Sequence, residues 1–175
     1  MAVAEERVEG VNYRGESLGG VLRSLTEHPE NTGVYGASGH LLLVDDGPGS
    51  RYYVVAVRSA QKKRWPRALD FSAGGMSSPG EAPIITVVRE TSEELLLRLE
   101  ETDLEFVASW RPCDGYWSHG AVYRAQTRDT LRWNALDIDE LRPMTADELV
   151  AAAEDEATLM KPDLRTFVKS HAELL

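Results

Sequence analysis

The sequence GMSSPGEAPIITVVRETSEELLL, residues 75–97, determines how the rest of the chain is interpreted. It begins in a turn rich in glycine and serine, and it contains no glycine after Glu81. Pro83 falls in what would be the first turn of a helix, where its missing N–H does no harm. Mostly apolar residues then recur at helical spacing and form one stripe, which consists of Ile84, Val88, Thr91 and Leu95. The pattern predicts an amphipathic helix.

Three glutamates share a neighbouring face of this helix, because Glu90, Glu93 and Glu94 stand at positions i, i+3 and i+4. Like charges at this spacing repel one another and weaken the helix unless something positive neutralises them. A divalent cation would do so, and Arg89 can pair with part of the cluster and fix its rotamers. The alternative is a solvated acidic face, in a chain that contains 29 Asp and Glu residues.

The spacing of the whole stretch resembles the signature of the Nudix hydrolases, Gly-x5-Glu-x7-Arg-Glu-U-x-Glu-Glu-x-Gly-U, in which U is aliphatic. The matching positions are Gly75, Glu81, Arg89, Glu90, Glu93, Glu94 and Leu97. The resemblance implies that Glu90, Glu93 and Glu94 bind a metal ion, often together with the backbone carbonyl of Gly75. The three glutamates and Arg89 are therefore the predicted catalytic residues, and Glu81 supports them through hydrogen bonds and ion pairs.

Two positions depart from this signature. Thr91 replaces an aliphatic residue on the buried side, which is a small change. Leu96 stands where the family has a glycine, which normally ends the helix in a left-handed conformation. With leucine at this position, we expect the helix to continue through Arg98 to Glu100, which makes it about one turn longer.

Length, charge and cysteine content limit the class of protein. The chain of 175 residues has a single-domain length, and we expect an N-terminal arm with a short helix over residues 1–35, packed on a Nudix domain at residues 36–175. The net charge of −10 argues against a nucleic-acid polymer as partner. The single cysteine, Cys113, fits a reducing compartment, and no apolar run is long enough to span a bilayer, so a cytoplasmic protein without membrane contact is expected.

Turn residues and apolar runs divide the chain into short elements. Residues 1–16 have no clear pattern and fit a loose arm or an edge strand, and a short helix is expected at residues 17–27. Strands are predicted at residues 41–44 and 51–57, which form a hairpin around a turn at 45–49, and at residues 104–110, 116–125 and 140–144. Thr145 and Glu148 form a capping box in front of a helix that ends near Asp155, and Pro162 begins a final helix to about Ala172. Residues 127–139 have the character of a loop.

A basic run precedes the glutamate helix and provides candidates for binding substrate phosphates. Arg58 ends a strand and is followed by Lys62, Lys63 and Arg64. The run resembles the segment before the signature in several Nudix branches that act on nucleoside diphosphate derivatives or related diphosphates. The functional interpretation assigns Arg58, Lys62 and Lys63 to the substrate phosphates. A solvated basic loop is the alternative.

Aromatic residues after the glutamate helix lie in the region where Nudix subfamilies differ in substrate. Trp110, Tyr116 and Trp117 could stack on a base, or they could belong to the core of the sheet. His119 is a candidate general base, whereas Cys113 has no histidine near it in sequence that would activate it as a nucleophile. Many family members use a further acid from a later loop, and Asp114 and Glu140 are the candidates for that role.

The order of elements predicts a mixed α/β layer architecture. The resemblance implies an α/β/α sandwich with a mixed sheet, whose catalytic motif is loop–helix–loop. The predicted function is Mg²⁺-dependent hydrolysis of the diphosphate linkage in a nucleoside diphosphate derivative or related nucleotide, with Mn²⁺ as a substitute. The alternatives are a Nudix-fold binding or regulatory domain without turnover, and an enzyme similar to isopentenyl diphosphate isomerase, which would need a cysteine ahead of the glutamate helix. A homodimer is compatible with the sequence.

Overall fold

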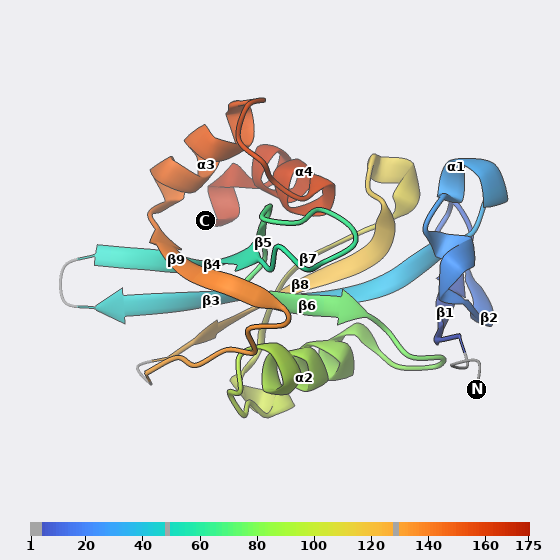
Figure 1. Ribbon diagram of the computed structural model, residues 1–175, viewed down its shortest axis with the longest axis horizontal. Helices are drawn as coiled ribbons and strands as arrows, with labels where there is room; N and C mark the ends of the chain where they lie inside the picture. Colours follow the sequence, from blue (N-terminus) through green and yellow to red (C-terminus); the bar gives the residue numbers. More distant parts are fainter. Residues whose placement is uncertain (1–4, 48–49, 128–129) are drawn as a thin grey trace.

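The computed structural model describes residues 5–47, 50–127 and 130–175, and it is built on a nine-stranded mixed sheet (Figure 1). The strands are β1 (Arg7–Val11), β2 (Ser17–Leu22), β3 (Tyr35–Gly47), β4 (Ser50–Arg58), β5 (Leu69–Asp70), β6 (Ala73–Met76), β7 (Glu105–Trp110), β8 (Ser118–Gln126) and β9 (Ile138–Met144). The α-helices are α1 (Pro29–Thr32), α2 (Pro83–Glu94), α3 (Ala146–Glu154) and α4 (Pro162–Ser170). Short 3₁₀ turns lie at Arg23–Thr26, Glu101–Asp103, Pro112–Asp114 and Ala172–Leu174.

The long strand β3 organises the sheet. It runs parallel to β8 over residues 36–44, and it pairs antiparallel with β6, with β4 and, at its start, with β1. Strand β4 in turn pairs with β9 and β5. β6 and β4 lie along successive parts of β3, and β5, which lies between them in sequence, pairs with β4.

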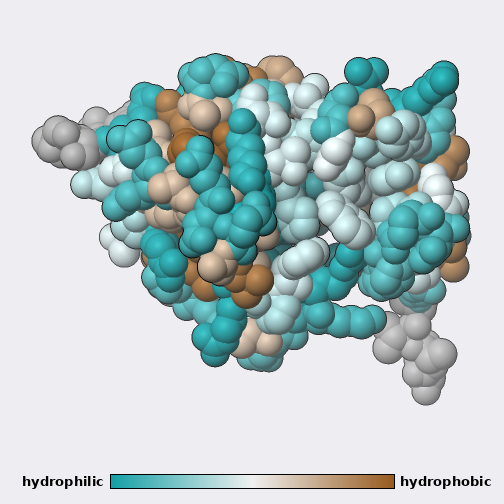
Figure 2. Space-filling view, turned by 90° about the horizontal axis from the view of Figure 1, so that it is seen from above, coloured by the Kyte–Doolittle hydropathy of each residue, from teal (hydrophilic) through white to brown (hydrophobic). Residues whose placement is uncertain are grey.

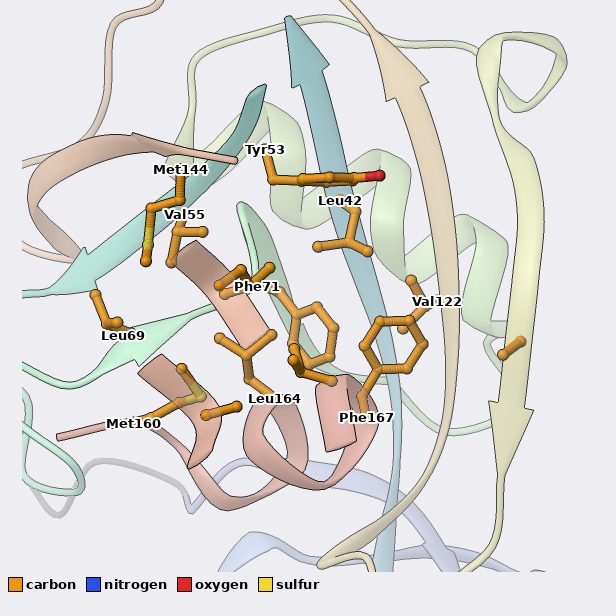
Figure 3. Close-up of a cluster of buried hydrophobic side chains, with 14 of the residues drawn as sticks. Leu42, Tyr53, Val55, Leu69, Phe71, Val122, Met144, Met160, Leu164 and Phe167 are labelled. Atoms are coloured by element: carbon orange, nitrogen blue, oxygen red, sulfur yellow. The ribbon is translucent and has the colours of Figure 1, made fainter. Parts of the chain in front are cut away.

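Helices cover both faces of the sheet, with α2 on one face and α3 and α4 on the other (Figure 1). Alternate residues of β3 point to opposite faces. Leu42 and Val44 therefore join the cluster under α3 and α4, which Figure 3 shows with Phe71 and Phe167, while Leu41 and Leu43 pack on the α2 side. The predicted α/β/α sandwich with a mixed sheet is confirmed.

Most of the predicted strands and the C-terminal helices are present. The hairpin of β3 and β4, the strands β7, β8 and β9, and the final helix α4 lie where expected, within a few residues. The capping box also forms: the Glu148 amide donates to the Thr145 hydroxyl at 3.2 Å, and the Thr145 amide donates to the Glu148 carboxylate at 2.8 Å. Parts of three predicted segments lie outside the described residues, namely residues 1–4, 48–49 and 128–129.

Two predictions near the N-terminus and before α2 are wrong. Residues 17–27 do not form a helix: β2 pairs with β1, and the chain then makes a 3₁₀ turn, in keeping with the poor helix propensity of Gly19 and Gly20. The segment expected as a glycine- and serine-rich turn contains strand β6, which pairs with β3. Strand pairing decides the conformation in both places, between neighbouring strands for β2 and with the distant β3 for β6.

The prediction that α2 continues past Leu96 is also wrong. The helix ends at Glu94, and Leu96 adopts φ 52°, the left-handed conformation that a glycine would normally take. The Leu96 side chain is 59% exposed, so packing offers little compensation for this backbone strain. Leu97 and Leu99 instead pack against the cluster on the α2 side. The chain therefore turns as the family signature requires, with a residue poorly suited to the turn.

Replacing Leu96 with glycine should raise the free energy of unfolding by about 1 kcal/mol, because glycine takes the left-handed conformation without a steric cost. Chemical denaturation of Leu96→Gly and the parent measures this difference. Leu96→Ala is the control, because it removes most of the side chain but keeps the strain. A glycine variant that is less stable than the alanine variant would contradict this explanation.

Candidate active site

A cavity of about 260 Å³ lies where α2, the loop after β4 and the start of α4 approach one another. The acidic wall consists of Glu90, Glu93 and Glu94, next to Gly74 and Gly75 of β6. The remaining wall includes Arg58, Lys62, Arg64, Trp65, Trp117, Lys161 and Asp163. The structure therefore brings the three predicted metal ligands together with two of the three predicted phosphate-binding residues.

Two of the glutamates are fixed against β6. The amide of Gly74 donates to Glu94 Oε2 at 3.0 Å. A Cβ atom added to Gly75 would lie 2.2 Å from Glu90 Oε1, so only glycine leaves room for this carboxylate. Burial raises the pKa of both carboxyl groups, and it raises that of Glu94 to about 7, with Glu90 nearby as a smaller cause. These are carboxylates whose charge a bound cation would stabilise.

Arg89 joins the glutamate cluster to the turn before the helix. Its guanidinium donates to both oxygens of Glu81, at 3.1 and 2.9 Å, to Glu90 Oε1 at 2.7 Å and to the Met76 carbonyl at 3.0 Å. The hydrogen bonds from Arg89 are the main reason that the pKa of Glu81 falls to about 2, and they raise the pKa of Arg89 itself. Arg89 therefore links Glu90 to Glu81 and to β6.

The third glutamate is differently placed. The Glu93 side chain is 59% exposed and lies 3.5 Å from Arg89 at its nearest contact. In the part of the chain that the structure describes, no three His, Cys, Asp or Glu side chains converge closely enough to hold a metal ion as they stand. The donors nevertheless fit a hard cation, because three carboxylates from one helix line one cavity and the exposed Glu93 side chain can rotate.

The predicted phosphate-binding residues have partners within the protein. Arg58 donates to Asp70 at 2.8 Å and to the carbonyls of Arg64 and Trp65, both at 3.2 Å. It thereby holds the loop in which Trp65 and Arg67 adopt left-handed conformations, with φ 52° and 61°. Lys62 is hydrogen-bonded to Asp137. Lys63 is exposed and is not among the residues that line the cavity.

The aromatic predictions divide between the core and the cavity. Trp110 and Tyr116 are 2% and 5% exposed and stack on each other with ring centroids 4.6 Å apart, so neither offers a free face to a base. Trp117 and Trp65 do line the cavity, and the Arg64 guanidinium lies 5.5 Å from the Trp117 ring centroid. Among the described residues, the lining does not include His119, Cys113, Asp114 or Glu140.

Sequence reasoning missed a buried polar group beside the start of α4. His40, Ser38, Ser118 and Asp163 form a hydrogen-bonded chain, with successive distances of 3.0, 2.8 and 3.1 Å. Burial and the Lys161 cation lower the pKa of His40 to about 3, so its imidazole is neutral. A Ser-x-His pattern in an apolar strand could have indicated that these side chains share a face, but only the pairing of β3 with β8 brings Ser118 to them.

The fold and the site define a Nudix enzyme, and comparison with known proteins agrees. The NUDIX domain family profile matches residues 36–168, and the chain therefore belongs to this family. The chain is 30% identical over 170 residues to a Nudix hydrolase of Deinococcus radiodurans, which covers 95% of this chain and 94% of that protein. It is 29% identical over 180 residues to an uncharacterised Nudix hydrolase of Rhodococcus erythropolis, with 96% and 92% covered.

A solved Deinococcus radiodurans structure superposes on this chain with a TM-score of 0.78 and 26% identity, over 94% of this chain and 98% of that one. The protein is accordingly a Nudix pyrophosphohydrolase. No helix in the described ranges is both long and apolar enough to cross a membrane. Figure 2 shows hydrophobic patches among hydrophilic residues on the face that carries α3 and α4.

The pKa of Glu94 predicts how stability depends on pH when metal is removed by a chelator. The carboxyl group ionises near 4.5 when unfolded and near 7 when folded, so the folded state binds more protons between these values. Stability contributed by this site is therefore present below pH 4.5 and is lost as pH rises through 7. Glu94→Gln should be about 2 to 3 kcal/mol more stable than the parent at pH 8, and nearly equal to it at pH 4.

Denaturant unfolding at the two pH values measures this difference. Glu93→Gln makes the same charge change at an exposed side chain and should alter stability little at either pH. An equal effect of both substitutions at pH 8 would show that general charge repulsion, and not burial of Glu94, is responsible.

Proposed function

We propose that the protein is a Mg²⁺-dependent hydrolase of the diphosphate linkage in a nucleoside diphosphate derivative, with Mn²⁺ as a substitute ion. The observation that carries the proposal is that Glu90, Glu93 and Glu94 line one cavity, with Glu94 largely buried and its pKa raised to about 7. Oxygen ligands of this kind suit Mg²⁺. When bound, the ion would neutralise charge on the phosphates and activate a water near neutral pH.

The residues around the cavity have distinct parts in this proposal. Glu90 and Glu94 hold fixed positions through Gly75 and Gly74, and Arg89 prevents Glu90 from turning away. Glu93 is exposed and can adjust to the ligand, and the Gly75 carbonyl completes the set of oxygen donors. Preorganised carboxylates of this kind avoid reorganisation during the reaction.

The substrate side of the cavity carries cations and aromatic rings. Arg58 acts by holding the loop that presents Arg64 and Trp65, since its N–H groups already contact Asp70 and two carbonyls. Lys62 is a proposed phosphate contact, and a bound phosphate would replace Asp137 as its hydrogen-bond partner. Trp65 and Trp117 are the exposed rings beside the cavity. The proposed contacts exclude Trp110 and Tyr116, which are buried, and Lys63, which does not line the cavity.

The two alternatives are less well supported. A binding domain without turnover would not need the intact set of glutamates. An isomerase-like reaction would need a cysteine at the cavity, and Cys113 is not among the described lining residues.

We place the protein in the cytoplasm or another reducing compartment, since Cys113 is its single cysteine. Residues 1–35 would form an N-terminal arm on a Nudix domain at residues 36–175, and a homodimer remains compatible.

Replacing Glu93 with glutamine should lower kcat by about two to four orders of magnitude, because one metal-holding charge is lost. Steady-state assays of purified protein with a panel of nucleoside diphosphate derivatives and Mg²⁺ measure this, and a chelator should abolish turnover. Glu101→Gln is the matched control, because Glu101 is exposed and lies outside the cavity. Turnover by Glu93→Gln equal to that of Glu101→Gln would refute the assignment.

A further inference from the structure

Lys161 is a cavity residue whose position is fixed by its backbone. It immediately precedes α4, and its amide donates to the Leu69 carbonyl at 2.9 Å, while the Leu69 amide donates to Leu159 at 2.9 Å. Met160 also forms a bridge with Leu69. The backbone of Lys161 is thereby tied to β5, and Lys161 lines the cavity with only 20% of its side chain exposed.

The hydrogen bonds of the neighbouring cations distinguish Lys161 from them. Arg58 uses Nε and both terminal nitrogens on protein acceptors, and Lys62 is hydrogen-bonded to Asp137. Lys161 Nζ lies 3.4 Å from Asp70 Oδ2, an oxygen that already accepts from Arg58 at 2.8 Å. Nζ makes no hydrogen bond to any described residue, although an ammonium group carries three donors.

The acids around Lys161 are committed elsewhere. Asp70 is bonded to Arg58, and Asp163 accepts from the Trp117 amide at 2.8 Å and from the Ser118 hydroxyl at 3.1 Å. Only 20% of the Lys161 side chain is exposed, and its ammonium donors are not taken up by the described acids, so an anionic oxygen in the cavity could accept charge-assisted hydrogen bonds from it. Lys161 immediately precedes α4, which covers one face of the sheet, whereas the glutamates belong to α2 on the other face (Figure 1), and all of these residues line the cavity.

We propose that Lys161 binds an anionic oxygen of the ligand's diphosphate, on the side of the cavity away from the glutamates. The proposal rests on the proposed function for the nature of the ligand. Lys161 is then a substrate-binding residue that stands more than 90 positions from the basic run at Arg58 and Lys62. The rival explanation is that Lys161 serves only as a second counter-ion for Asp70.

Binding of inorganic pyrophosphate, measured by titration calorimetry with Mg²⁺ present, tests the proposal without requiring turnover. Lys161→Met should weaken binding by about 10- to 100-fold, because a charge-assisted hydrogen bond in a partly buried site is lost. Lys169→Met is the matched control, since Lys169 lies on α4, the helix that Lys161 precedes, and pairs with the exposed Glu156 at 3.2 Å. This control should bind as the parent does. Lys161→Arg keeps the charge beside Asp70 and should recover most of the affinity.

Kinetics on the best substrate separate binding from folding. Lys161→Met should raise KM much more than it lowers kcat, whereas loss of a counter-ion for Asp70 alone would lower the unfolding temperature and leave KM unchanged. If Lys161→Met does not fold, the comparison of Lys161→Gln with Lys161→Arg takes its place. Pyrophosphate affinity equal to that of Lys169→Met, or no pyrophosphate binding by the parent, would overturn the inference. Pyrophosphate binding by the parent without hydrolysis of any nucleoside diphosphate derivative would instead contradict the proposed function.

Discussion

The rest of the site depends on the hydrogen bonds that the Arg89 guanidinium donates. It joins the helix that supplies the glutamates to the turn that precedes it, through Glu81 and the Met76 carbonyl, and it holds Glu90 at the same time. One charged group thereby connects β6, the turn at Glu81 and the glutamate face of α2. Without it, Glu90 would repel its acidic neighbours, and the close approach to Gly75 would have no cause. A lysine could not replace it, because the contacts require several donors in a planar arrangement.

The charges around the cavity determine which ligands it can bind. The chain has a net charge of −10, and the described cavity lining contains five cationic and six acidic side chains. Such a cavity does not attract a diphosphate by its long-range field. Affinity must therefore come from a bound cation and from donors that the protein does not already use. The acidic wall therefore suits a metal ion. The cations best able to bind a diphosphate are those whose hydrogen-bond donors are not already used within the protein, such as Lys161.

Local sequence patterns predict the elements that depend on local interactions. The glutamate spacing predicts α2, the capping box at Thr145 predicts the start of α3, and the apolar run predicts β3. Each of these patterns spans only a few residues. Leu96 shows a limit, because helix propensity favours continuation while Leu97 and Leu99 are drawn into the core, and tertiary packing decides the outcome. Lys161 shows another limit. Its place in the cavity follows from a bridge between Leu69 and Met160, and no local pattern encodes such a pairing over 91 positions.

The central claim is that the glutamate face of α2 holds the metal that the reaction needs. A crystal grown with Mn²⁺ and a non-hydrolysable nucleoside diphosphate analogue, with anomalous diffraction recorded at the manganese edge, tests it most directly. We expect an anomalous peak within coordination distance of Glu90, Glu93 and Glu94, with Arg89 still bound to Glu81. A peak held instead by Asp70, Asp137 or Asp163, with the three glutamates unliganded, would show that the metal is not held by α2.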